Sequence, residues 1–215
     1  MKDRRQGLQL AIGVYTGHRA NWIYFALLLI CGGYSLYTGA LFRQAWIILA
    51  VFAGTPILEY FTHKYVLHFP LPRDRQKHPL WYEIMHRIHY AHHEDPKAIA
   101  HIFAPWWFTL PFFLLYTGGV YLISGQWPLT AVFATGLILY FLIYEWTHYM
   151  AHCDAYAPRN RYSRFLKKFH SWHHYKSEAH WYGITSPLAD LCLGQWKDPK
   201  TVEASPLALK NRGRE

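Results

Sequence analysis

Cysteine and charge are both scarce in this chain of 215 residues. Its three cysteines, Cys31, Cys153 and Cys192, lie far apart and form no C-x-x-C pair, so the sequence supports neither a disulfide framework nor a cysteine zinc site. Only 16% of the residues are charged, against about 25% in an average soluble protein, whereas 52% are hydrophobic. This composition disfavours an ordinary soluble domain, and the length fits one membrane domain over residues 1–215.

Acidic residues are fewer than basic ones, 13 against 22, which leaves a net charge of +9. The basic residues lie beside apolar runs. An anionic membrane surface is therefore the expected partner for this charge, and no nucleic-acid partner is expected.

Four long apolar runs organise the chain, each close to the length that a bilayer span requires. They cover residues 22–41, 46–61, 104–124 and 129–144. Very short turns separate the first run from the second and the third from the fourth, and Pro111 predicts a kink in the third. The sequence thus predicts an all-α integral membrane fold with four transmembrane helices, in preference to buried helices of a soluble protein.

Lys and Arg are distributed unequally between the two sides of these spans. Of the 22 basic residues, only Arg43 lies in a short turn. The positive-inside rule then predicts cytoplasmic termini and a cytoplasmic position for residues 62–103 and 153–215. Helices are expected within these polar segments over residues 79–94 and 161–174, and the tail from Asp198 is expected to be loose.

Ten histidines fall in four clusters, each beyond the end of an apolar run. Three clusters have i, i+3 or i+4 spacing, which predicts one shared helical face in each cluster. His63 and His68 are about 140° apart on an ideal α-helix, so we expect them to straddle a helix end and to serve different metals or different sides of one site. The clusters are His63 and His68; His89, His92 and His93; His148 and His152; and His170, His173 and His174.

Neutral imidazole is a good ligand for iron, zinc, copper and nickel. Ten ligands are too many for one ion, so the sequence predicts two ions with about five nitrogens each and positions left for water or oxygen. His86 and His180 lie close enough to the clusters to be ligands or neighbours of ligands. His18, His78 and His101 are assigned to the surface or the membrane interface.

Three acids are candidates for supporting the metal ligands. Glu59 lies one turn before His63, and Glu145 lies three residues before His148. Acids at such depth are costly, and they are usually paired or functional. We expect them to accept N–H bonds from ligand imidazoles, with a salt bridge as the alternative. Asp190 is expected to act likewise or to cap a turn.

These motifs resemble those of the fatty acid hydroxylase superfamily, also labelled sterol desaturase-like, over about residues 51–196. The segments Glu59-Tyr-Phe-Thr-His63, His89-Tyr-Ala-His92-His93 and His170-Ser-Trp-His173-His174 carry the resemblance. Tyr182-Gly-Ile-Thr-Ser186, followed by Asp190, is most similar to the fatty acid 2-hydroxylase branch. Cys153 departs from the pattern, because many relatives have a second histidine there.

The resemblance implies four transmembrane helices capped by a cytosolic histidine-rich region, and an O₂-dependent C–H oxidation at two iron ions. It implies a lipid substrate, with a fatty acyl chain preferred. Because all-nitrogen sites hold zinc more tightly than ferrous iron, zinc is an alternative occupant in purified samples. The haem electron-carrier domain fused to eukaryotic 2-hydroxylases is absent from this sequence, so a separate electron-donor protein is expected. The compact length favours a bacterial inner-membrane protein.

Other functions remain as alternatives. A sterol-type or carotenoid-type oxidase, or a desaturase, would use the same scaffold. A membrane metal-binding or transport protein would also use histidines, but here they cluster outside the spans. A protein that only binds anionic lipid would account for the charge and would leave the histidine spacing unexplained.

Overall fold

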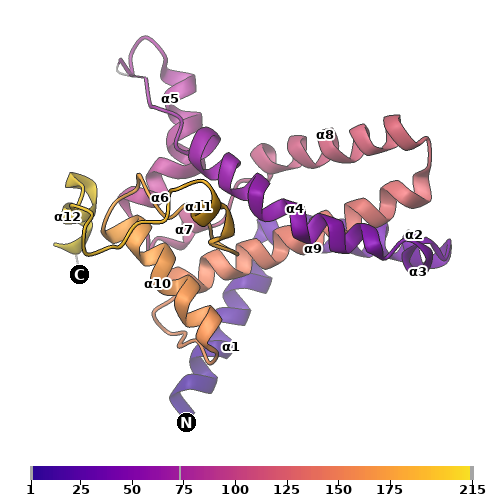
Figure 1. Ribbon diagram of the computed structural model, residues 1–215, viewed down its shortest axis with the longest axis horizontal. Helices are drawn as coiled ribbons and strands as arrows, with labels where there is room; N and C mark the ends of the chain where they lie inside the picture. Colours follow the sequence, from indigo (N-terminus) through magenta and orange to yellow (C-terminus); the bar gives the residue numbers. More distant parts are fainter. Residues whose placement is uncertain (1, 73, 214–215) are drawn as a thin grey trace. The chain divides into compact units, whose positions relative to one another are not determined.

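The computed structural model describes residues 2–72 and 74–213, and within that part every regular element is a helix (Figure 1). The chain divides into two compact units. The apolar unit comprises Ile12–Thr55 and Ala104–Trp146. The histidine unit comprises Met1–Ala11, Pro56–Phe103 and Thr147–Glu215. Helices α4 (Trp46–Phe61) and α9 (Trp127–His152) contribute residues to both units.

The apolar unit also contains α2 (Arg19–Tyr37), α3 (Ala40–Arg43) and α8 (Trp106–Ser124). Helices α8 and α9 form a hairpin (Figure 1). Gly136 of α9 permits close approach to α4, because an added Cβ would lie 3.3 Å from Cα of Ile48. Tyr24 packs against Phe141 with ring centroids 4.5 Å apart. Small residues and aromatic pairs therefore hold these helices together.

In the part of the chain that the structure describes, four helical segments are long and apolar enough to cross a membrane, which confirms the four expected runs. They are Arg19–Tyr37, Trp46–Leu67, Ile99–Ser124 and Trp127–His152. Large apolar side chains are widely exposed on them, including Leu122 at 83% and Ile123 at 90%. Such exposure suits lipid rather than water as the surrounding medium. By these criteria the chain is a multi-pass membrane protein.

The histidine unit is built from shorter elements. The N-terminal helix α1 (Lys2–Gly17) begins in this unit. Residues 79–94 form one helical stretch, as expected, although it passes through a π-helical segment. The elements are η1 (Thr62–Leu67), α5 (Pro79–Met85), η2 (His86–Tyr90), α6 (Ala91–Glu94), α7 (Ile99–Ile102), α10 (Arg161–Tyr175), α11 (Leu188–Cys192) and α12 (Pro206–Arg212).

The expectation of a loose tail is wrong. Ser205 caps α12 by accepting a hydrogen bond from the backbone N–H of Ala208. Nδ2 of Asn211 donates to the carbonyl of His93 at 2.8 Å, and Nε of Arg212 donates to the carbonyl of Tyr175 at 2.6 Å. These polar contacts attach the tail to the last turns of two histidine-bearing helices. Because apolar content is low, composition gave no sign of them.

Candidate metal centre

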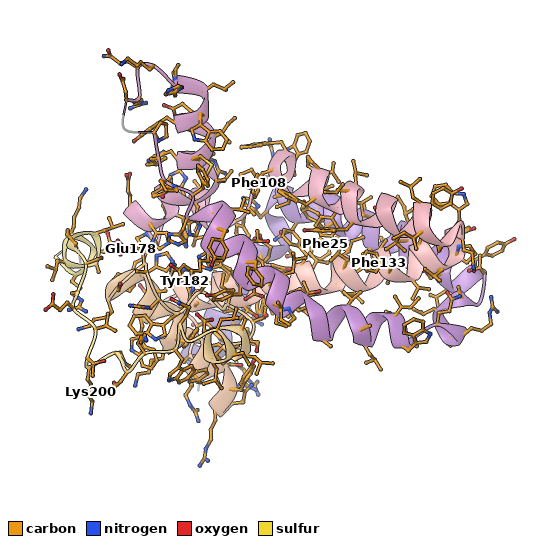
Figure 2. The ribbon with its side chains drawn as sticks, turned by 45° about the horizontal axis from the view of Figure 1, so that its top comes forward. Phe25, Phe108, Phe133, Glu178, Tyr182 and Lys200 are labelled. Carbon is orange, nitrogen blue, oxygen red and sulfur yellow. The ribbon has the colours of Figure 1, made fainter. Side chains whose placement is uncertain are left out.

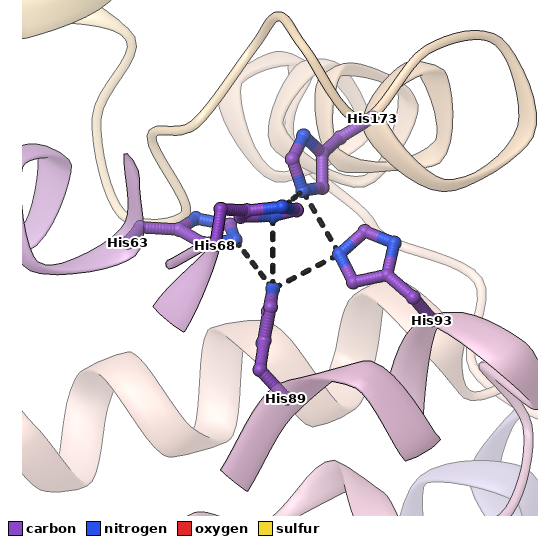
Figure 3. Close-up of side chains that lie close together, drawn as sticks. All are labelled: His63, His68, His89, His93 and His173. Carbon is purple, nitrogen blue, oxygen red and sulfur yellow. Dashed lines mark hydrogen bonds between the residues drawn. The ribbon is translucent and has the colours of Figure 1, made fainter. Parts of the chain in front are cut away.

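All ten cluster histidines lie in two groups of five within the histidine unit. In each group the candidate ligand atoms lie within 4.8 Å of one another. The first histidine group, drawn in Figure 3, is His63, His68, His89, His93 and His173. The second histidine group is His92, His148, His152, His170 and His174. Nine of the ten side chains are buried, and His68 is half-buried.

Each H-x-x-H-H motif is divided between the groups. His89 and His93 belong to the first group, whereas His92 belongs to the second. The motif on α10 is divided in the opposite sense, with His173 in the first group and the other two in the second. Residues four apart on a helix point in similar directions, whereas adjacent residues are about 100° apart. The expectation that the three histidines of each H-x-x-H-H motif share one helical face is therefore wrong.

His63 and His68 lie in the same group, which excludes the first of the two alternatives, that they serve different metals, and leaves the second, that they lie on different sides of one site. Residues Thr62–Leu67 form a π-helix, and the backbone N–H of His68 donates to the carbonyl of His63 at 3.1 Å. A spacing of five residues is close to one turn in this geometry. His68 is the residue that follows the helix, as expected.

The nitrogens within each group converge at distances that fit a shared metal ion. In the first group, Nε2 of His89 lies 3.2 Å from Nε2 of His63, 3.0 Å from that of His68 and 2.9 Å from that of His93. In the second group, Nε2 of His148 lies 3.0 Å from that of His92. Two nitrogens about 2.1 Å from one ion and at a right angle to each other would be about 3.0 Å apart.

The tautomers fixed by neighbouring carbonyls also fit a cation. Nδ1 of His63 donates to the carbonyl of Tyr182 at 2.5 Å, and Nδ1 of His173 donates to that of His180 at 2.7 Å. A neutral imidazole with its hydrogen on Nδ1 presents a lone pair at Nε2. Lone pairs gathered in a buried space repel one another unless a cation lies between them. Both nitrogens of the buried His174 have no hydrogen-bond partner, which further favours metal binding.

Burial also keeps these imidazoles in the form that binds metal. Desolvation, followed by the influence of neighbouring histidines, holds the pKa of His89, His93 and His174 well below the usual value. The pKa values of His92, His170 and His173 are lowered in the same way. The imidazoles are therefore neutral near pH 7 and have lone pairs available for a metal.

Two predicted acids hold one loop against the first group. Oδ1 and Oδ2 of Asp190 accept hydrogen bonds from the backbone N–H groups of Tyr182 and Gly183, at 2.7 and 2.8 Å. Oε1 of Glu59 accepts from the backbone of Ile184 and Thr185, and Oε2 accepts from the Thr185 hydroxyl. These bonds come from the loop backbone and the Thr185 hydroxyl rather than from imidazoles. They orient His63 indirectly, through the carbonyl of Tyr182.

The loop itself contains residues that sequence reasoning did not assign to the site. The ring of Tyr182, labelled in Figure 2, has its centroid 5.6 Å from that of His63 and 5.4 Å from that of His173. Gly183 leaves no space for a side chain, since an added Cβ would lie 2.1 Å from the carbonyl oxygen of Ser186. The Tyr182-Gly183 pair in the quoted motif was the available signal for both residues.

Glu145 lies in the apolar unit and is 1% exposed. Its Oε1 accepts a hydrogen bond from the backbone N–H of Ala104 at 3.2 Å, whereas its Oε2 is buried with no hydrogen-bond partner. A buried carboxylate oxygen left in this way is costly, so this acid is a candidate functional residue.

The remaining candidate histidines lie outside both groups. Nε2 of His86 pairs with Glu94 at 3.2 Å, and His180 supplies its backbone carbonyl to His173. His18, His78 and His101 belong to neither group. Cys153 is also in neither group, and each group has five histidines without it. His180 therefore acts through its main chain.

The fold and this site define a class of protein: a multi-pass helical membrane protein with paired five-histidine groups able to bind metal. The family described as "Fatty acid hydroxylase" matches residues 46–195. The chain belongs to the fatty acid hydroxylase family. This confirms the family expected from the histidine motifs.

Relatives in plants, yeast and animals agree with this assignment. The chain is 31% identical over 169 residues to dihydroceramide fatty acyl 2-hydroxylase FAH2 of Arabidopsis thaliana, covering 73% of this chain and 63% of that protein. It is 31% identical to ceramide very long chain fatty acid hydroxylase scs7 of Schizosaccharomyces pombe, covering 73% and 44%. Human fatty acid 2-hydroxylase is 29% identical, covering 64% and 36%. These alignments thus span less than two thirds of each relative's length.

A solved structure shares the fold. The hydroxylase domain visible in full-length scs7p superposes with a TM-score of 0.72 and 22% sequence identity, covering 86% of this chain and 68% of that chain. The match supports the helical architecture. The names of the relatives agree with the 2-hydroxylase branch expected from the Tyr182–Asp190 segment.

Proposed function

We propose that this chain is an O₂-dependent di-iron hydroxylase that acts on a fatty acyl chain. The observation that carries the proposal is the pair of five-nitrogen groups in a member of the fatty acid hydroxylase family. Several relatives are named as fatty acyl 2-hydroxylases, which favours hydroxylation next to the carboxyl end of the chain. No observation specifically favours a desaturase, a sterol-type or carotenoid-type oxidase, or a metal transporter.

The ten histidines would hold two iron ions, one in each group. Bound iron would supply the redox chemistry that activates O₂, which zinc lacks even where it occupies the same nitrogens. The carbonyls of Tyr182 and His180 keep the hydrogens of His63 and His173 on Nδ1, so that Nε2 remains available to metal. Burial of the groups excludes bulk water from the reacting centre.

The acids have distinct roles in this proposal. Asp190 and Glu59 position the loop that orients His63. Glu145 holds the start of the third span through Ala104, and its second carboxylate oxygen would accept a hydrogen bond from a polar group of the substrate or from water. No side chain is required as a nucleophile.

The cellular setting is part of the same proposal. The whole chain, residues 1–215, would act as one hydroxylase domain in a bacterial inner membrane. The distribution of Lys and Arg supports cytoplasmic termini and a cytoplasmic metal site. Electrons would come from a separate donor protein.

Lipid mass spectrometry of cells with and without the gene tests the proposal directly. Expression should produce a lipid that has gained one oxygen at carbon 2 of its acyl chain. A variant with His89→Ala and His148→Ala, expressed at the same level, is the control and should produce none. Lipid profiles that do not differ between the unaltered protein and this control would reject the hydroxylase assignment.

A further inference from the structure

A basin of about 720 Å³ opens on the histidine unit. It is formed by the end of α9, one side of α10, residues 199–200 and α12. Lys200 is one of its lining residues, and Figure 2 shows that side chain extending outward from the ribbon. All of the residues that line the basin belong to the histidine unit.

The basin is strongly basic. Asp154 is the one acid among the described residues that line it, and it pairs with Lys97 at 3.1 Å. A concave surface with charge of one sign attracts a partner of the opposite sign and speeds its association. Its six cationic residues are Lys97, Lys167, Lys168, Lys176, Lys200 and Arg212.

Some of these cations also have structural roles. Nζ of Lys167 donates to the carbonyls of Met150, Cys153 and Tyr156, and it thereby caps the C-terminal end of α9. Lys168 and Lys200 are exposed, with Lys168 placed over the ring of Trp172 at 5.4 Å. These two lysines can meet a partner without breaking the fold.

The basin reaches the second histidine group through one residue. His152 lines it, whereas the other four members of that group do not. Nε2 of His152 lies 2.9 Å from Nε2 of His170, within the group. Among the members of that group, His152 is therefore the one that a molecule in the basin can contact. This arrangement suits electron transfer through His152 better than delivery of the substrate carbon atom to the histidine groups.

We propose that this basin is the docking surface for a small, acidic, one-electron carrier protein. The inference rests on the proposed hydroxylase function, whose balance is R–H + O₂ + 2 e⁻ + 2 H⁺ → R–OH + H₂O. A one-electron carrier must therefore dock twice for each product. Docking over His152 places its redox group beside the one member of the second histidine group that lines the basin, and the lysines select an acidic surface.

The test compares two double variants of the full chain. The basin variant carries Lys168→Glu and Lys200→Glu. The control variant carries Lys77→Glu and Arg161→Glu, which are exposed, make the same change in net charge and do not line the basin. Binding of a plant-type [2Fe–2S] ferredoxin and of a cytochrome b5 haem domain is measured on zinc-loaded protein in detergent, so the readout does not depend on turnover.

At an ionic strength of about 0.01 M, where the Debye length is about 30 Å, we expect at least one carrier to bind the basin variant about 10-fold more weakly than the control. The difference should shrink at about 0.15 M salt, where the Debye length is about 8 Å. Failure of both carriers to bind the unaltered protein, or equal binding by both variants, would overturn the docking assignment. The docking assignment would also be supported if coenzyme A, at matched ionic strength, displaced neither carrier. If coenzyme A bound and neither carrier did, the basin would be assigned to an anionic small molecule.

Turnover driven by dithionite, with no carrier present, separates this inference from the proposed function. The basin variant should form product with dithionite and lose about 10-fold of its rate with the carrier. Absence of product from the unaltered protein under both conditions would count against the hydroxylase function, while the binding comparison would still decide the docking surface.

Discussion

The main-chain carbonyl of Tyr182 accepts a hydrogen bond from Nδ1 of His63 at 2.5 Å. The loop that carries this carbonyl is held by Asp190 on one side and by Glu59 on the other. Neither acid is an expected metal ligand, yet both fix where one nitrogen of the first histidine group points. Support of this kind commonly changes metal affinity or activity by about 10–100-fold.

Asp190→Asn should weaken metal binding at the first histidine group by about 10-fold or more. The amide can accept only one of the two backbone N–H bonds that the carboxylate accepts, so the loop and the Tyr182 carbonyl should shift. Competition with a chromophoric chelator measures the affinity. Asp198→Asn is the control, since Asp198 accepts a backbone bond from Lys200 far from the histidines in sequence and outside both groups. Equal affinities in the two variants would contradict the role assigned to Asp190.

Single ligand losses should affect metal content strongly. His89→Ala and His148→Ala remove one nitrogen from the first and the second group respectively. We expect each to lower affinity by at least about 10–100-fold, because loss of a ligand should cost no less than loss of its support. His78→Ala should keep two ions, since His78 is exposed and in neither group. Metal analysis at matched expression decides this, and normal metal content in the first two variants would refute the ligand set.

Stability of the metal-free protein should fall as the pH decreases below about 6.5, the ordinary pKa of histidine. The folded protein holds the pKa of His89, His93 and His174 well below that value, so the unfolded chain binds protons first. The stabilising effect is therefore complete above the unfolded pKa and is lost toward the lower folded values. Thermal unfolding in chelator from pH 8 to pH 5 should show this decline. A Tm that stays level or rises on acidification would contradict buried, neutral histidines.

Asn211→Ala should destabilise the histidine unit by about 1–3 kcal/mol, the usual cost of leaving a buried carbonyl unpaired. Asn211 is 2% exposed, and its Nδ2 donates to the carbonyl of His93. Denaturant unfolding and metal retention both report the effect. Lys210→Ala is the matched control, because Lys210 is exposed on the same helix. Similar unfolding midpoints for the two variants would show that α12 does not support the site.

A cysteine at Gln126 should react with a membrane-impermeant thiol reagent applied from outside the cell. Gln126 lies between α8 and α9, in a turn with no Lys or Arg, so the positive-inside rule places it opposite the basic segments. The test uses a background with Cys192→Ser, because Cys192 is the exposed native thiol. Labelling only after the cells are opened would reverse the proposed topology.

Much of the fold was predictable because its signals are local. Apolar runs of span length gave the four membrane helices, and the polar segments gave the helices expected at residues 79–94 and 161–174, the second one residue shorter than α10. The chemistry of the site followed from the residue type, since imidazoles in such numbers have few other uses. The histidine set therefore needed no tertiary information.

The remaining features depend on geometry that sequence spacing does not specify. An α-helical wheel separates His63 from His68, whereas the π-helical turn brings them into one group. The division of each H-x-x-H-H motif depends on where the partner helices lie. The bond from Asn211 to His93 joins residues 118 positions apart, and no local pattern records it.

The division of the H-x-x-H-H motifs limits how this protein can change over evolutionary time. His92 lies beside His93 on one helix, yet the two residues belong to different groups, and His173 and His174 repeat the arrangement. A mutation that rotates either helix displaces nitrogens of both groups at once. One candidate ion site therefore cannot drift toward a different metal or a different coordination number while its neighbour stays fixed. Variation within such a lineage should accumulate on the exposed apolar faces of the spans, with the two histidine groups inherited as a single unit.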